Sequence, residues 1–413
     1  MDCPKAKRTE VMVTCPSDDA LVEILSRLRA KPLFRFKCVS KAWRDLITER
    51  LRCREFPQTL EPEGFFIGEM DVNYGDFVGL LGRPVPLVDP SFSFLTKNLP
   101  KSEKIVLLGS CNGLVLFGHR RVSDIFETDS LGYIVCNPAT EQWVAVPSSF
   151  STKREDGGDE SNANDGPVGG AYYLQTYLIF DPAVSPHFQL VQFWLFDGLG
   201  DLAEVHTFSS VTGEWRRREG VEGQAWSQWG SDCALWVTSE ACPFKGMLHV
   251  SIIRDFQARM EMHRMIVAVD GEGKPFRTMH WPDNRGSIVF VGQSQGHLHC
   301  VSEHSDFERK MTEFSIWVLE GYDEEKWVLR DTVSIYKLLQ SVSEHFYPRC
   351  DVIAIHPDRG LVFFNVKWVW KLISYDMDTK EVRALCTLRQ YYSWYITPYV
   401  PYFAESAALA KNY

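Results

Sequence analysis

The sequence predicts a multi-domain α + β chain: a three-helix module at the N-terminus, then an all-β domain expected to be a β-propeller of about six blades. Two observations carry this prediction. Residues 17–53 place apolar side chains at helical spacing behind capping residues. From about residue 105, short runs of Val, Ile, Leu and Phe alternate with Gly, Pro, Asn and Asp, a pattern typical of many short strands.

The composition bounds what the chain can be. At 413 residues it is long for a single core, and 45% hydrophobic residues supply enough apolar surface for a folded one. Lys and Arg number 44 against 54 Asp and Glu, a net charge of −10. A chain of that sign gains little from phosphate backbones or anionic lipid, so we expect neither a nucleic-acid nor a membrane partner.

Cysteine usage and the N-terminal residues predict the compartment. Residues 1–8 are charged and lack the apolar core of a signal peptide, and no apolar run approaches the roughly 18 residues of a membrane span. The 11 cysteines are scattered singly, with no Cys-x-x-Cys pair, and most sit in apolar runs, which indicates buried, reduced thiols. We therefore expect the cytoplasm, the nucleus or both.

The helical module is read from its caps and its apolar positions. Ser17 or Asp18 caps a first helix, a break follows at 29–32, and Ser40 caps a third helix. A unit of about forty residues without disulfides or metal rarely holds itself together. Its apolar residues are also too many for one internal core, so the pattern predicts a partner surface.

Residues 18–28 and 33–47 resemble the F-box of plant F-box proteins. Family members begin with Leu-Pro where this chain has Cys15-Pro16, and they carry Pro where it has Arg29, so the start of the first helix and the turn after it are expected to differ. The resemblance implies docking onto a Skp-family adaptor and, through it, onto the cullin and RING subunits of a ubiquitin ligase. The contact residues that it implies are Pro16, Leu21, Ile24, Leu25, Leu28, Leu33, Phe36, Cys38, Val39, Trp43 and Leu46. The alternative is that these side chains only pack the helices against the second domain.

A weak internal repeat organises the β-rich part. Its unit is a Gly-headed strand, a second strand, an Asx/Thr/Gly turn and a closing strand, first seen across 111–117 and 133–143. A spacing of roughly 45 to 70 residues suits propeller blades, of which we read five directly and expect a sixth. The first unit is similar to the opening of the kelch-like F-box-associated domain of plant proteins. A β-sandwich or a less regular barrel is the alternative.

These patterns set the expected domain boundaries. They are a flexible N-terminus at 1–14, the F-box at 15–55, a partly stranded connecting segment at 56–104, the propeller at 105–400 with a disordered loop at 151–170, and a tail at 401–413.

Little in the sequence indicates catalysis. His297, His299, Cys300, Glu303 and His304 form the one metal-capable cluster, and alternating His in a strand is interpreted as structural. Residues 270–275 lack the ending of a phosphate loop and predict a hairpin turn, while 216–218 read as a solvated basic strand end. We expect no catalytic residue, metal or cofactor.

Protein recognition is expected on the loops between blades. Two aromatic clusters are the candidates for the substrate surface: Trp226, Trp229 and Trp236, and Tyr391, Tyr392, Trp394 and Tyr395. Their alternative role is to fill the propeller core. The sequence thus predicts a non-catalytic substrate receptor of a cullin-RING ligase; the rivals are an adaptor-bound scaffold without ubiquitin transfer and, less favoured, a propeller enzyme.

Overall fold

A computed structural model describes most of the chain. The described residues are 16–28, 30–37, 39–50, 63–69, 74–82, 84–124, 130–149, 172–196, 202–219, 226, 234–256, 261–281, 286–306, 310–340, 349–367, 369–388, 394–404 and 406–409. The predicted flexible N-terminus at 1–14 and the predicted loop at 151–170 lie outside them, as do Cys38, Trp229, Tyr391 and Tyr392.

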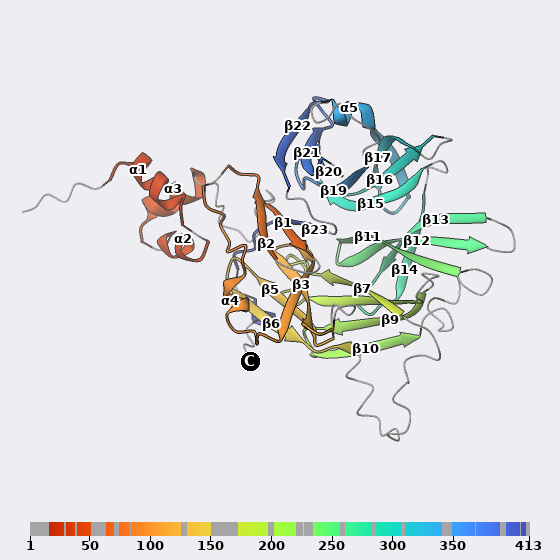
Figure 1. Cartoon of the computed structure of the whole chain (residues 1–413), viewed down its shortest axis with the longest axis horizontal. Helices are drawn as coiled ribbons and strands as arrows, with labels where there is room; N and C mark the ends of the chain where they lie inside the picture. The colour runs from red at the N-terminus through yellow and green to blue at the C-terminus, as the bar shows by residue number, and fades with distance from the viewer. Residues whose placement is uncertain are drawn as a thin grey trace, which may run out of the picture.

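Three short helices form the N-terminal module, as predicted: α1 (Asp18–Leu25), α2 (Ala30–Lys37) and α3 (Lys41–Glu49) (Figure 1). Both predicted caps form, because the Ser17 hydroxyl accepts from the backbone N–H of Ala20 and the Ser40 hydroxyl accepts from that of Trp43. An ion pair of 2.8 Å between Arg50 and Asp19 links the end of α3 to α1. None of the described helices is long and apolar enough to cross a bilayer.

The rest of the described chain is a six-bladed β-propeller, which confirms the predicted fold and excludes the sandwich and the barrel. Five blades have four antiparallel strands in sequence order. They are β3 (Glu103–Cys111), β4 (Leu114–Arg121), β5 (Gly132–Asn137) and β6 (Gln142–Val146); β7 (Tyr172–Ile179), β8 (Gln189–Phe196), β9 (Leu202–Ser209) and β10 (Glu214–Glu219); β11 (Ala234–Phe244), β12 (Met247–Phe256), β13 (Glu261–Val269) and β14 (Pro275–His280); β15 (Ser287–Ser294), β16 (His297–Ser305), β17 (Met311–Gly321) and β18 (Lys326–Ser334); β19 (Cys350–Ile355), β20 (Leu361–Val366), β21 (Lys371–Asp376) and β22 (Val382–Thr387). Helix α5 (Ile335–Leu339) follows β18.

The sixth blade pairs the first two strands of the propeller with its last strand. Its strand order is β2 (Tyr74–Gly79), β1 (Gly64–Glu69) and β23 (Trp394–Tyr399), with Gly64 opposite Tyr399. The propeller therefore begins at Gly64, and the boundary predicted at 105 is too late. It is too late because this blade is assembled from two distant segments, so no local repeat marks it.

The six inner strands are β3, β7, β11, β15, β19 and β23, each packed against the next around the ring. The later residues of all six line one central cavity, so all six run in the same direction. We call the end where these strands finish, near Cys111, Phe244 and Tyr399, the turn end. The opposite end, where they begin, is the loop end.

The C-terminal segment after β23 packs against the turn end. The Tyr402 ring meets the Phe180 ring edge-on, with centroids 5.3 Å apart, and Leu409 in the 3-10 helix η3 (Ala407–Leu409) is fully buried. Gly113 has a φ of +91°, and a Cβ at that position would collide with Tyr402. The predicted tail is thus part of the propeller core as far as residue 409.

Candidate docking and recognition surfaces

The helical module has an internal core of its own. Leu25, Leu33 and Ile47 are buried, one from each helix, and Leu28, Phe36, Trp43 and Leu46 pack against them. The Phe36 and Trp43 rings lie 5.3 Å apart between centroids. Leu25 and Leu33 were expected at the adaptor surface; in this chain both pack inward, because a module this small needs its largest aliphatic residues for its core.

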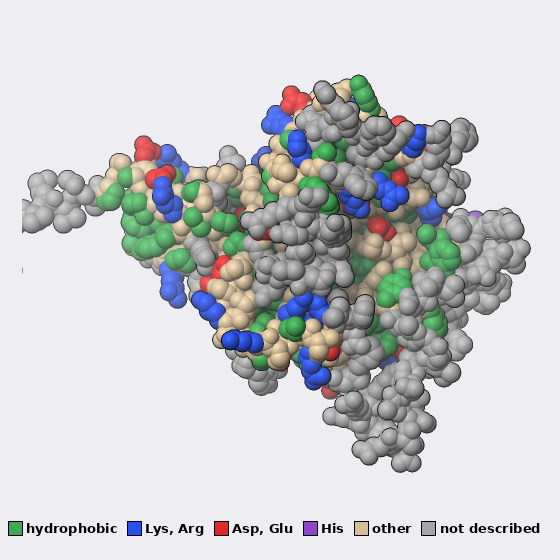
Figure 2. Space-filling model, viewed as in Figure 1, with side chains coloured by type: hydrophobic (Ala, Val, Ile, Leu, Met, Phe, Trp, Pro, Cys, Tyr) green, Lys and Arg blue, Asp and Glu red, His purple; other side chains and the backbone are tan. Residues whose placement is uncertain are grey.

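A second set of apolar side chains in the same module faces solvent. Ile24 is 55% exposed and Val39 is 59% exposed, Pro16 is exposed, and Leu21 is half-buried. Figure 2 shows hydrophobic side chains gathered over the module that holds α1–α3. A cluster of exposed apolar groups on a folded module is typical of a protein interface.

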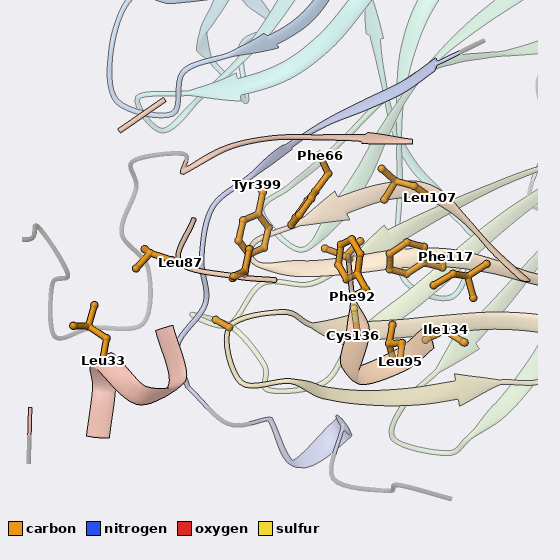
Figure 3. Close-up of a cluster of buried hydrophobic side chains, with 14 of the residues drawn as sticks. Leu33, Phe66, Leu87, Phe92, Leu95, Leu107, Phe117, Ile134, Cys136 and Tyr399 are labelled. Carbon is orange, nitrogen blue, oxygen red and sulfur yellow. The ribbon is translucent and has the colours of Figure 1, made fainter. Parts of the chain in front are cut away.

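Buried side chains continue from this module into the propeller. One cluster runs from Leu25 and Leu33 through Leu87 and Val88 to Tyr399 in β23. Figure 3 shows Leu87 between Leu33 and Tyr399, and Phe92 beside Phe117 and Leu95. A hydrogen bond holds Leu87 in place, because the backbone N–H of Leu87 donates to the carboxylate of buried Glu63. Continuous packing of this kind holds the two units in one arrangement.

Asp89 fixes the backbone in the middle of the connection between β2 and β3, residues 80–102. Its buried carboxylate accepts hydrogen bonds from the backbone N–H groups of Ser91 and Ser93, each 3.2 Å away, at the start of α4 (Ser93–Thr96). Phe92, between them, has a φ of +47°, and its ring packs edge-on against Phe117 with centroids 4.8 Å apart. The connecting segment is therefore part of the fold.

The predicted aromatic surface divides into core and partly buried residues. Trp226 is fully buried, its indole N–H donates to the Gly273 carbonyl over 3.2 Å, and its ring contacts Phe193. Placing it on a substrate surface was wrong, since the indole fills the core between two blades. Trp236 is half-buried in β11, near the loop end.

Trp394 and Tyr395 open the inner strand β23 at the loop end. Their backbones pair with Glu69 and Gly68 of β1, while their side chains lie outside the described part of the chain. Trp236 and Trp394 are therefore both close to the start of an inner strand, at the same end of the ring.

Three of the four longest connections between strands leave the loop end; the fourth, 80–102 between β2 and β3, starts at the turn end and carries Leu87 and Asp89. The three at the loop end are 147–171 between β6 and β7, 220–233 between β10 and β11, and 335–349 between β18 and β19. At the turn end, the connections at 112–113, 245–246 and 295–296 are two-residue hairpins. Figure 1 shows β12 and β13 extending away from α1–α3, so the loop end points away from the helical module.

Two cavities lie toward the turn end. The central one has a volume of about 490 Å³ and is lined by all six inner strands. A second, of about 620 Å³, lies beside the blade β19–β22 and is lined by Leu80, Leu81 and a rim of charged residues that includes Asp358, Asp376 and Arg383.

The metal-capable residues predicted at 297–304 are spread along strand β16 and have different surroundings. His299 is buried with its Nδ1 3.1 Å from the His297 carbonyl oxygen, whereas His304 Nε2 lies 3.0 Å from the Ser315 hydroxyl. Burial lowers the pKa of His299 to about 4, raises that of the Cys300 thiol well above its usual value, and raises that of Glu303. Within the described residues, no three His, Cys, Asp or Glu side chains come together as metal ligands.

The two other sequence features take the forms predicted for them. Residues 270–274 form the β13–β14 hairpin turn, with the Asp270 carboxylate accepting from the backbone N–H groups of Glu272 and Lys274. Residues 216–218 lie in β10, the outermost strand of its blade, where Arg217 pairs with Glu204. Six cysteines are described as free thiols: five are buried, and Cys386 is half-buried.

Comparison with known proteins agrees with this architecture. The family model described as "F-box protein At3g26010-like, beta-propeller" matches residues 84–399, and the F-box domain model matches residues 17–54. F-box protein At5g49610 of Arabidopsis thaliana is 24% identical over 370 residues, which cover 86% of this chain and 89% of that protein.

Other matches are more local. Putative F-box protein At1g31090 of Arabidopsis thaliana is 29% identical over 148 residues, 34% of this chain and 46% of that protein, so the match spans less than half of this relative. Among solved structures, the complex of KlAtg21 with the coiled-coil of AgAtg16 has a TM-score of 0.39 at 8% identity, over 78% of this chain and 81% of that one.

Proposed function

This chain belongs to the F-box proteins that carry an At3g26010-like β-propeller, and from that premise we propose that it is the substrate-recognition subunit of an SCF-type cullin-RING ubiquitin ligase. The F-box docks on a Skp-family adaptor, and the propeller binds a protein target. The chain itself makes and breaks no bond. It supplies proximity by holding a target lysine near a conjugating enzyme that other subunits carry.

One observation carries the proposal: an exposed apolar face on a module that is packed continuously onto a closed propeller. Ile24 and Val39 belong to a set of apolar side chains that water solvates poorly, so a protein surface that covers them gains free energy. The buried cluster through Leu87 keeps the propeller at a fixed orientation to whatever binds that face. Fixed orientation is what delivery of a target to an enzyme requires.

The loop end of the ring suits the target. Its long connections leave the ring at this end, and loops carried on rigid strands are where such scaffolds usually bind partners. Trp236 and Trp394 lie where those connections join the inner strands, and aromatic residues are enriched where interfaces gain most of their affinity. Buried reduced thiols at Cys136 and Cys300 suit work in the cytoplasm or nucleus.

The docking role is tested with the double variant Ile24→Asp, Val39→Asp. Both side chains are largely exposed, so the fold should survive while a carboxylate disrupts the apolar interface. Purified Skp-family adaptor is titrated against the wild-type and variant chains, and circular dichroism monitors the fold. We expect the affinity for the adaptor to fall by at least about tenfold, which is the usual effect of changing residues at the centre of an interface.

A matched control is the double variant Val184→Asp, Val211→Asp. These valines are 73% and 66% exposed on turns of the propeller, so the charge change is equal but lies outside the F-box. It should leave adaptor binding unchanged. Failure of the folded wild type to bind the adaptor would refute the proposal.

Ligase activity is separated from adaptor binding by reconstitution with cullin, RING subunit and charged conjugating enzyme. Proteins cross-linked to the loop end in cells are purified and offered as substrates. Ubiquitin transfer that requires both the F-box face and the loop end supports the receptor. Adaptor binding with no transfer to any loop-end partner supports the scaffold instead.

A further inference from the structure

The central cavity lies among the six inner strands of the propeller. Its volume of about 490 Å³ lies within the range of about 300–1,000 Å³ that is usual for small-molecule sites. Its walls are mainly apolar, and four aromatic side chains contribute to them: Phe65, Tyr177, Phe290 and Phe363. A few polar groups interrupt the apolar wall, among them Ser110 and Thr397, whose hydroxyl oxygens lie 3.0 Å apart.

The charge of the lining is unbalanced. Among the residues that line the cavity, Glu240 is the one carboxylate, and no Lys, Arg or His is present. Its one hydrogen bond in the described part of the chain comes from the Ser239 hydroxyl, 2.9 Å away. Burial raises the pKa of the Cys111 thiol to about 12 and raises that of the Tyr177 hydroxyl, so both stay neutral beside it. A carboxylate at the edge of an apolar space attracts a cation.

An irregularity in β11 brings Glu240 to this position. Val237 pairs with Ile252 and Ala241 with Val250, so the three residues 238–240 bulge opposite the single residue 251. The Thr238 hydroxyl donates to the Ser251 carbonyl over 3.0 Å, and the Tyr177 hydroxyl lies 3.3 Å from the Ser239 carbonyl oxygen. Bulges of this kind re-aim side chains and are common beside functional sites.

A second feature of the cavity wall is the open space beside Gly109. At Gly109 in β3, a Cβ would have no atom within 4 Å, and the backbone there is not left-handed. Gly109 therefore borders open space at a second register shift, between Leu107 and Gly109. Strand interiors disfavour glycine, because it adds conformational entropy to the unfolded chain and packs nothing.

The geometry points to a binding site for a small organic cation in this cavity: a protonated amine, paired with Glu240, on an aromatic or aliphatic body that fills the apolar space. The amine forms a charge-assisted hydrogen bond with Glu240 and cation–π contacts with the faces of the surrounding aromatic rings. The body of the ligand displaces water from the apolar walls. The site is independent of adaptor docking, since none of its residues lies in the F-box.

The test uses the full-length chain and three probes of similar shape: 2-phenylethylamine, neutral 2-phenylethanol and anionic phenylacetate. Isothermal titration calorimetry measures binding, and a thermal-shift assay checks that each probe stabilises the folded chain. We expect 2-phenylethylamine to bind with a stoichiometry of one. Both other probes should bind at least about tenfold more weakly, because neither can form the charged hydrogen bond to Glu240. One hydrogen bond to a charged group is worth about that factor in affinity.

Two variants locate the site. Glu240→Gln keeps the shape and removes the charge, so it should weaken the amine by about tenfold and leave 2-phenylethanol unchanged. Gly109→Leu places a branched side chain in the cavity and should weaken binding of both by at least about tenfold. The control Glu214→Gln changes an exposed glutamate at the start of β10 and should have no effect.

The proposal is overturned if no amine binds the folded wild type, if the alcohol binds as tightly as the amine, or if Glu240→Gln binds the amine unchanged. The glutamine variant alone keeps the test decisive should Gly109→Leu fail to fold.

Discussion

The side-chain amide of Asn137 donates a hydrogen bond to the carbonyl oxygen of Tyr402, 2.8 Å away, across 265 positions of sequence. The Oδ1 atom of the same side chain accepts from the backbone N–H of Ala139 over 3.0 Å. One fully buried residue thus shapes the β5–β6 turn and fixes the C-terminal segment to it.

Replacing Asn137 with Ala should lower the free energy of unfolding by about 1–3 kcal/mol, because the Tyr402 carbonyl and the turn lose a buried partner. Urea unfolding followed by tryptophan fluorescence measures the change. Asn98→Ala is the control, since Asn98 is exposed and bonds only the local Phe94 carbonyl. Equal losses in the two variants would contradict the role assigned to Asn137.

Removing residues 394–413 should prevent the ring from closing. Without β23, the inner edge of β1 has no hydrogen-bonding partner and Phe65 and Phe66 lose their cover, so we expect aggregation or loss of the cooperative thermal transition. Differential scanning calorimetry and size-exclusion chromatography report both. A chain ending at Leu409 keeps β23 and should behave as wild type; a stable monomer after the larger deletion would refute closure by this strand.

Trp226→Ala should destabilise the chain by about 3–5 kcal/mol, since a large buried side chain leaves a cavity. Trp226→Phe should cost less, because only the hydrogen bond to the Gly273 carbonyl and part of the volume are lost. Chemical denaturation ranks the two variants. Unaltered stability in Trp226→Ala, with loss of a bound target, would return this residue to the recognition surface.

Acid should destabilise the propeller through His249 and His299. Burial lowers the pKa of each to about 4, whereas an unfolded His titrates near about 6.5. Between these values the unfolded chain binds more protons, so the free energy of unfolding falls as pH falls from 6.5 towards 4. The loss between pH 7 and pH 5 is on the order of 2 kcal/mol for each histidine.

The measurement is the urea midpoint of wild type, His299→Gln and His263→Gln at pH 7 and pH 5. His299→Gln should show a smaller fall in midpoint than wild type, because one buried titrating group is gone. His263 is exposed in β13, so its variant should fall as wild type does. Identical falls in all three would show that buried histidines do not govern the acid response.

Leu87→Ala should loosen the connection between the F-box and the propeller while leaving the exposed face of Ile24 and Val39 intact. Leu87 is buried in the cluster that links the two units, so its truncation removes packing at the joint. Small-angle X-ray scattering should show a larger maximum dimension, with adaptor affinity unchanged. Val78→Ala in β2, half-buried on the opposite side of the sixth blade, should leave the scattering unchanged.

Local signals predicted most of the fold. Ser17 and Ser40 cap their helices as read, and the Gly-headed strands at Gly113, Gly246 and Gly296 each open the second strand of a blade. The sixth blade was expected but not located, because its strands are separated by the rest of the ring and the pairing between Gly64 and Tyr399 leaves no periodic trace in either segment.

The site was predicted less completely. The F-box contact residues stay a prediction, and helices of eight or nine residues did not reveal that Leu25 and Leu33 turn inward while Ile24 and Val39 turn outward. Trp226 was a candidate for the substrate surface with core filling as its alternative role, and the buried indole that donates to the Gly273 carbonyl has the alternative role. Glu240 gave no signal at all, because a bulge without Gly or Pro reads as ordinary strand.

The closing strand also sets the order in which this protein becomes competent during translation. The F-box is synthesised before the propeller, and β1 must then wait for the five intervening blades before β23 reaches it. A message truncated before residue 394 would encode a docking module without a closed ring. Under the proposed function, such a product would occupy the adaptor without a closed ring to hold a target.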